Sequence, residues 1–182
     1  MAETQLHNYS VQEKLNKMDV DIVDVTLNID NANTGVYADG DLLFPVTEIP
    51  YAVSVNGGSA LLQSVSIIVS GSADGSETGN MDLVITSDAT ALIKSGPASL
   101  VDNEVIATAC TSPLSVMDGI CGSFSINNII DMGIVSVGSK QNIGMVCKAE
   151  AASRSLHVFG IARSTNDYEE GSAVLRLGFV KD

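Results

Sequence analysis

The side chains best suited to catalysis or metal binding are scarce in this sequence. It contains two histidines, His7 and His157, and three cysteines, Cys110, Cys121 and Cys147. The cysteine spacings match no zinc-binding pattern, and neither histidine has a partner at the spacing of a metal ligand or a general base. We therefore expect His157 to be structural and the cysteines to be reduced, mostly buried thiols of a protein made in a cytoplasm, with a disulfide as the alternative.

Two acidic loops that contain glycine, residues 30–41 and 71–80, raise the question of a calcium site. Counted from an aspartate of each loop, an EF-hand needs an oxygen ligand at position 3, where the first loop has Ala32. It also needs Glu at position 12, where the second loop reaches Ile85. Solvated turns are the favoured interpretation of both loops, and an irregular Ca²⁺ site is the alternative.

Motifs of cofactor binding and nucleophilic catalysis are also missing. The sequence has no phosphate-binding loop, no dinucleotide fingerprint between a strand and a helix, and no nucleophile elbow. Aromatic residues make up only 4% of the chain and Trp is absent, which argues against a sugar-binding cleft and against stacking platforms for single-stranded nucleic acid. We expect a protein that is not an enzyme, with no catalytic residues, no cofactor and no metal.

The charge balance argues against two classes of partner. Nine basic residues stand against 22 acidic ones, giving a net charge of −13, so the chain repels phosphate backbones and anionic lipid surfaces. No apolar stretch approaches the length of a membrane span, and the first residues contain no apolar core of a secretory signal. We expect no nucleic-acid partner and no membrane partner.

Residues 1–18 differ from the remainder in their hydrophobic period and are expected to form an N-terminal arm. Ser10 and Glu13 fit a capping box, and Val11, Leu15 and Met18 recur at helical spacing. This pattern predicts a short amphipathic helix, which is marginal alone in water and must lie on its own domain or on a partner.

From residue 19 to residue 182 the patterns predict a single β-rich domain. Apolar side chains alternate cleanly from Val23 to Ile29, and Pro45 and Pro50 restrict residues 42–55 to an edge strand or a covering loop. Further strands are expected over residues 60–70, 81–87, 103–109, 133–138, 142–150, 155–163 and 172–180.

The absence of a repeating strand–helix–strand rhythm indicates a mainly β fold, an antiparallel β-sandwich or a barrel-like roll. Within it we expect a long-tipped hairpin over residues 60–87 and a C-terminal hairpin over residues 156–180. Short helical turns are expected over residues 88–94 and 125–133.

Four segments of the sequence have a distinctive order: "DLLFPVTEIP" from Asp41 to Pro50, the pair Gly57-Gly58 followed by "LQSV", the strand that begins Asp82-Leu83, and the close from Leu156 to Asp182. In these segments the chain resembles a family of tailed-phage virion proteins from marine and related phages. The similarity extends over about two thirds of the chain. It does not cover residues 90–130, and the loop "STNDYEEGS" is more acidic than in the family.

This resemblance implies a capsid decoration or cement protein, a β scaffold that binds the outside of an assembled shell. Its implied partners are the major capsid protein and further copies of itself, usually as a homotrimer. Its implied place is the capsid surface of the virion, after synthesis in the host cytoplasm. The alternative is a receptor-binding or adhesive head-fibre domain.

Two segments are candidates for the interfaces that such a protein needs. The last strand has apolar residues on both faces, so we expect one face to meet the domain core and the other a neighbouring subunit. We call this expected contact between subunits the seam, and its candidate residues are Arg163, Arg176 and Phe179. The two arginines either pair with carboxylates across the seam or simply lie on the surface. In the arm, Val11, Leu15 and Met18 are the candidates for shell binding.

Overall fold

Nine β-strands account for the regular structure that is described. The computed structural model describes residues 20–29, 37–70, 79–90, 119–127, 129–133, 135–163 and 171–181. Its strands are β1 (Val20–Ile29), β2 (Leu42–Ile49), β3 (Ser59–Ser70), β4 (Met81–Thr86), β5 (Ile120–Ile126), β6 (Ile129–Asp131), β7 (Val135–Lys148), β8 (Leu156–Ala162) and β9 (Gly171–Lys181). The arm helix predicted within residues 1–18 and the strand predicted over residues 103–109 lie outside these ranges.

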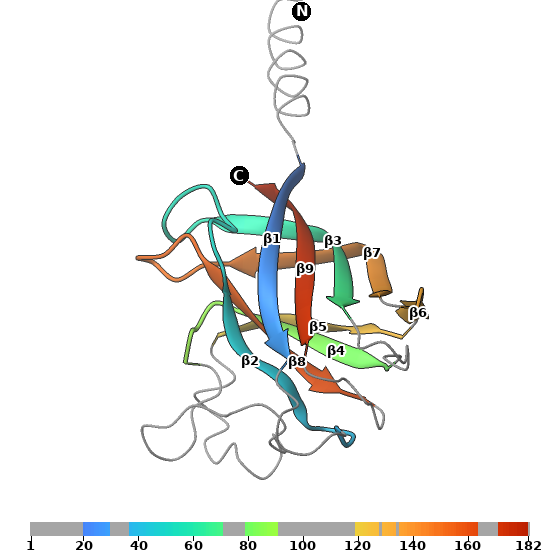
Figure 1. Cartoon of the computed structure of the whole chain (residues 1–182). Helices are drawn as coiled ribbons and strands as arrows, with labels where there is room; N and C mark the ends of the chain where they lie inside the picture. The colour runs from blue at the N-terminus through green and yellow to red at the C-terminus, as the bar shows by residue number, and fades with distance from the viewer. Residues whose placement is uncertain are drawn as a thin grey trace, which may run out of the picture.

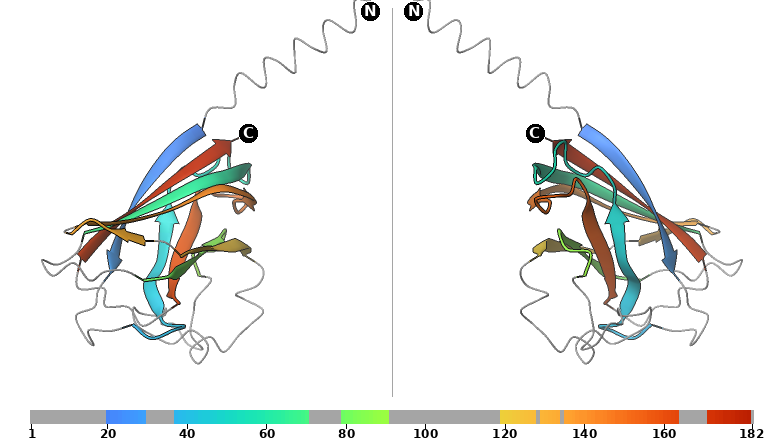
Figure 2. Two further views of the ribbon diagram at one scale, coloured as in Figure 1. Left: turned by 90° about the vertical axis from the view of Figure 1, so that its right-hand side faces the viewer. Right: turned by 90° about the vertical axis from the view of Figure 1, so that its left-hand side faces the viewer.

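The strands form two antiparallel sheets that pack face to face. One sheet has the order β1-β9-β3-β7-β6 and the other the order β2-β8-β4-β5. Figures 1 and 2 show the two layers, with β1 and β9 side by side in one and β2 and β8 side by side in the other. The prediction of a mainly β, antiparallel sandwich is therefore confirmed. In the described parts of the chain, no helix is long and apolar enough to span a membrane.

The pairing is nested. If the short strand β6 is left aside, the first strand pairs with the last, β2 with β8, β3 with β7 and β4 with β5. This is the pattern of a jelly roll, in which a long antiparallel ribbon is rolled into two sheets. Strand β6 pairs with β7 and adds a strand at that edge.

The hairpins predicted over residues 60–87 and 156–180 are both wrong, because the nested pairing places the two strands of each in different sheets. Strand β3 pairs with β7 and β9, whereas β4 pairs with β5 and β8 in the other sheet. In the same way β8 pairs with β2 and β4, and β9 with β1 and β3. Alternation shows which face of a strand is buried, but it does not show whether the next strand lies beside it or across the core.

The first two strands agree with their sequence patterns. Val25, Leu27 and Ile29 of β1 are buried while Asp24 and Thr26 are exposed, which is the predicted alternation. Strand β2 lies at the edge of its sheet, as its prolines predict, with Pro45 exposed on a strand that needs no partner on one side.

The helical turn predicted over residues 125–133 is wrong. The end of β5 and the whole of β6 occupy this segment, and only a short connection separates them. The two strands predicted over residues 133–150 are one strand, β7, which bulges against β3 where Asn142 and Gly144 adopt positive φ angles of 57° and 67°. The turn predicted over residues 88–94 lies partly outside the described residues.

The core lies between the sheets and is almost wholly aliphatic. The inner face of β9 supplies Ala173, Leu175, Leu177 and Phe179, all of them fully buried. Opposite them, the inward residues of β8 are small or branched, and Gly160 leaves room for the ring of Phe44 on the neighbouring strand. Glycine is needed there because a Cβ atom would lie 2.3 Å from the nearest ring carbon of Phe44.

Candidate interaction surface

The outer face of the five-stranded sheet carries two rows of aliphatic side chains. In the first row, the strand register places Val20 beside Val180, Val180 beside Leu61 and Leu61 beside Val146. We call this the first aliphatic row. Val20 and Val146 are 53% and 69% exposed, while Val180 and Leu61 are half-buried. Ile22 extends the row along β1 and is 65% exposed.

The second aliphatic row crosses the same face further along the strands. The register places Val174 beside Ile68, Ile68 beside Val137 and Val137 beside Ile130. Ile130 is 66% exposed and the other three are half-buried. An antiparallel sheet with one solvated face normally carries polar side chains there, so the two aliphatic rows make this face the candidate interaction surface.

A polar row with a paired charge separates the two aliphatic rows. Asp24 of β1 and Arg176 of β9 are direct cross-strand neighbours, and Ser66 and Ser139 continue the row across β3 and β7. Arg176 donates from Nε to Asp24 Oδ1 and from Nη2 to Asp24 Oδ2, each over 2.9 Å. This fork of two hydrogen bonds lowers the pKa of Asp24 and raises that of Arg176. The pair adds no net charge to the face.

Gly178 leaves space on β9 for side chains of the two neighbouring strands. A Cβ atom at this position would lie 2.5 Å from Ser64 Oγ and 3.2 Å from Val20 Cγ1. Glycine therefore allows the side chains of both neighbouring strands to lean over β9, so the surface beside Ile22 is built from three strands at once.

The candidate seam residues lie in three different places. Arg176 is on the outer face described above, whereas Arg163 directly follows β8 of the other sheet. Arg163 donates from Nε to Asp82 Oδ2 over 2.6 Å, and its Nη1 lies 3.9 Å from Asp39 Oδ1. Both arginines thus have carboxylate partners within the chain, and their pairing across a seam stays a prediction.

Phe179 does not belong to any surface. It is fully buried on the inner face of β9, so its assignment as an interaction residue is corrected to a core position. Val174 and Val180 are the residues of the same strand that lie on the outer face of the sheet. Val11, Leu15 and Met18 lie outside the described residues, and their role in shell binding stays a prediction.

Sequence reasoning missed most of the aliphatic rows because they are assembled from five strands. One signal was present: Val20 and Ile22 have the opposite parity to the buried series that begins at Val23, so they point to the other face. The contributions of β3 and β7 could be recognised only once the register placed them beside β9.

The chemistry-bearing residues occupy the other sheet and its border with β7. His157 is half-buried on β8, with Glu48 and Thr86 as its cross-strand neighbours. Cys121 and Cys147 are both free thiols, and Cys110 lies outside the described residues. Among the side chains that are described, no three His, Cys, Asp or Glu groups gather closely enough to hold a metal ion.

Comparisons with known proteins include distant likenesses to solved structures. No protein-family model matches the chain, and neither does any curated protein. Solved structures with some likeness include a semi-empty virus-like particle of the nodavirus of the giant freshwater prawn Macrobrachium rosenbergii, at 7% identity and a TM-score of 0.34, over 88% of this chain and 92% of that one.

A second is the structure of tomato aspermy virus, at 7% identity and a TM-score of 0.32 over 90% of this chain and 78% of that one. A third is a deletion mutant of the Penaeus vannamei nodavirus capsid protein, at 9% identity and a TM-score of 0.33 over 87% of this chain and 92% of that one. Likenesses at this level define no family, and the assignment of a jelly roll rests on the strand pairing alone.

Proposed function

We propose that this protein is a structural component of a virion that decorates the outside of a phage capsid and assembles with itself through the outer face of the five-stranded sheet. The observation that carries the proposal is the pair of aliphatic rows on that face. The resemblance of two thirds of the sequence to phage decoration proteins supports it, and so does the jelly roll, an architecture that recurs in viral capsid domains.

The occupant of the face is a second copy of the same chain. Each copy has a net charge of −13, so two copies repel each other wherever carboxylates meet. The aliphatic rows bring no charge, and the Asp24–Arg176 pair between them is neutral. This face is therefore a place where copies can meet without bringing unpaired carboxylates together.

The finer assignments follow the resemblance. The assembly is a homotrimer, the major capsid protein is the second partner, and the arm over residues 1–18 supplies the contact with the shell. Decoration requires only binding, so neither a cofactor nor a catalytic residue enters the proposal.

The test is the mass of the protein in solution, measured by light scattering over a range of concentrations. The proposal expects a mass three times the 18.9 kDa of one chain. Val180→Asp and Val20→Asp place a carboxylate in the first aliphatic row and should yield folded monomers. Ser123→Asp adds the same charge on an exposed position of β5, in the other sheet, and should leave the mass unchanged.

Val20→Asp is included because it should not disturb folding: Val20 is already 53% exposed at the start of β1. A wild-type protein that stays monomeric at every concentration, or a Val20→Asp variant with unaltered mass, would refute assembly through this face. Co-sedimentation with matching empty capsids tests decoration separately. We expect the full chain to bind the capsids and the chain without residues 1–18 to lose this binding. A full chain that does not bind the capsids would favour an adhesive domain.

A further inference from the structure

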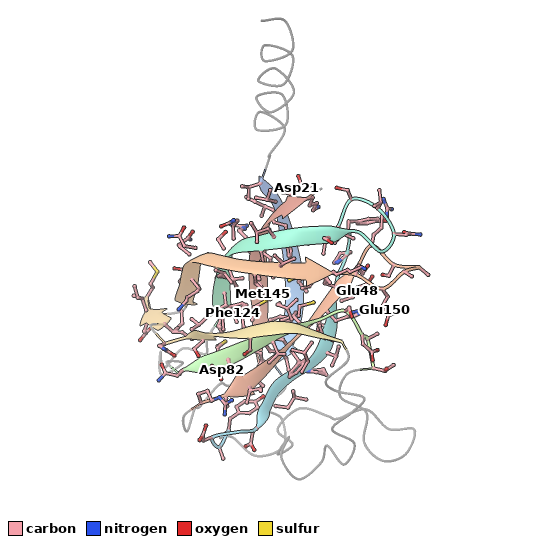
Figure 3. The ribbon with its side chains drawn as sticks, turned by 180° about the vertical axis from the view of Figure 1, so that it is seen from behind. Asp21, Glu48, Asp82, Phe124, Met145 and Glu150 are labelled. Atoms are coloured by element: carbon pink, nitrogen blue, oxygen red, sulfur yellow. The ribbon has the colours of Figure 1, made fainter. Side chains whose placement is uncertain are left out.

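Two cysteines from different sheets meet at the side of the sandwich where β5 and β7 approach each other. Cys121 lies near the start of β5 and Cys147 near the end of β7, with 25 residues between them in the sequence. Cys147 is fully buried, while Cys121 is half-buried and packs against the core that contains Cys147. Figure 3 shows the same approach of the strands at Phe124 and Met145, which lie between the sheets.

The local backbone explains why Cys121 faces Cys147. The register of β5 against β4 shifts between Gly122, which pairs with Ile85, and Ile120, which pairs with Thr86. Cys121 is the extra residue of this bulge, so its side chain is released from the regular alternation of the strand. It can therefore turn towards the last residues of β7.

Cys121 is also accessible to small molecules. It lines an open cleft of about 360 Å³ together with Val146 and Lys148 of β7. The buried Cys147 lies behind it. The Cys121 thiol can therefore react with a reagent from solvent, whereas the Cys147 thiol can react only with Cys121.

The contacts between the thiols favour ionisation of the outer one. The two thiols donate to nearby carbonyl groups, Cys147 to Met145 O over 3.8 Å and Cys121 to Gly119 O over 4.0 Å. The neighbouring Cys147 thiol favours the thiolate form of Cys121 and is the main cause that lowers the pKa of Cys121 to about 7. Burial acts in the opposite direction, and the backbone N–H of Lys148 adds a further lowering. The neighbouring Cys121, together with burial, raises the pKa of Cys147. A thiolate with a neighbouring protonated thiol is the arrangement of a nucleophile and a resolving cysteine.

We propose that Cys121 and Cys147 are a redox-active pair that closes into a disulfide between the two sheets when the protein meets a low-molecular-weight disulfide. The Cys121 thiolate attacks one sulfur of the reagent, forms a mixed disulfide and releases one reagent thiolate. Cys147 then loses its proton, attacks the Cys121 sulfur and releases the second reagent thiolate. Two protein thiols are oxidised and one reagent disulfide is reduced to two thiols, so electrons and protons balance.

The closed form should be the more stable one, since a covalent link between β5 and β7 restricts the unfolded chain. For a loop of this length we expect the midpoint of thermal unfolding to rise by about 5–10 °C. This inference rests on the thiol pair alone and is independent of the proposed role in a virion.

The experiment uses the full chain with Cys110→Ser, so that two cysteines are left, and oxidised glutathione as the reagent. After treatment, the intact mass should show the loss of two hydrogens with no bound glutathione, and a non-reducing peptide map should link Cys121 to Cys147. Adding Cys147→Ser should stop the reaction at one bound glutathione. Adding Cys121→Ser should leave Cys147 unreacted, because it is buried.

A second measurement does not require that the double variants fold well. In the Cys110→Ser chain, the rate of alkylation by iodoacetamide as a function of pH should have a midpoint near 7. Two free thiols after prolonged treatment with oxidised glutathione, or a persistent glutathione adduct on the Cys110→Ser chain, would overturn the proposal. So would an alkylation midpoint at the ordinary thiol value of 9.0.

Discussion

Gly160→Ala should destabilise the protein by more than an alanine normally costs in a strand. Gly160 of β8 pairs with Phe44 of β2, and the Phe44 ring lies over the position that a Cβ atom would take. That atom would lie 2.3 Å from Cε1 and 2.9 Å from both Cδ1 and Cζ of the ring. Carbon atoms in contact prefer about 3.5–4.0 Å, so the ring has to move by more than about 1 Å.

The ring has little room to move, because Phe44 is fully buried in the core. Overpacking a well-filled core typically costs about 1–3 kcal/mol, and this overlap belongs at the upper end. We expect Gly160→Ala to lower the free energy of unfolding by about 2–3 kcal/mol. Urea unfolding followed by circular dichroism measures this change directly, with an unaltered dependence on urea concentration as the sign of an intact two-state transition.

Gly122→Ala is the matched control, since it is also a strand glycine with a close neighbour. Its Cβ atom would meet Met145 Cε at 2.8 Å, which is the far end of a flexible side chain. Met145 can rotate away, so we expect a smaller cost than at Gly160. Phe44→Leu completes a double-mutant cycle and should relieve most of the cost of Gly160→Ala. Equal costs of Gly160→Ala with Phe44 and with Leu at position 44 would refute the steric explanation.

Two further predictions concern the outer face. The carboxyl group of Asp24 should titrate below its ordinary pKa of 3.8 because Arg176 donates two hydrogen bonds to it, so the stabilisation from this pair is present above that value and is lost as the pH falls through the lowered pKa. NMR titration should return the pKa of Asp24 towards 3.8 in Arg176→Gln, and an identical titration in both proteins would contradict the pairing. Val180→Thr keeps a β-branched side chain while adding a hydroxyl to the first aliphatic row, so thermal unfolding of the monomer should change little while self-association, followed by sedimentation, weakens. Unchanged association would show that this row does not need to be apolar.

The sequence predicts the class of the fold because most of the strands, although not β5 and β6, have their own signature. The alternation from Val23 to Ile29 identifies the buried face of β1, and Pro45 identifies an edge strand. These signals are local, and local hydrogen bonding and burial are enough to explain them. The error over residues 125–133 also has a local cause, because the three residues of β6 are too short to show a period.

Pairing between strands could not be predicted in the same way. In the nested arrangement, β1 and β9 are partners although they lie at opposite ends of the chain. The choice between a hairpin and a crossing of the core depends on how whole sheets pack, and no window of sequence contains that information. The hairpin expected over residues 156–180 is an example. Strands β8 and β9 would show the same apolar faces in the sequence whether they paired in one sheet or lay opposite each other in two sheets, and they lie in two sheets.

The same nesting explains why the candidate site emerges only from the structure. The first aliphatic row joins Val20, Leu61, Val146 and Val180, and each of them alone is an unremarkable aliphatic residue in a strand. Their alignment cannot serve the core, because the core side of these strands is already filled by the residues of opposite parity. Cross-strand contacts between neighbours explain part of their presence, since such pairs stabilise a sheet. They do not explain why the exposed members at both ends, Val20 and Val146, are aliphatic as well. The proposed contact of this face with a second copy would account for the whole row.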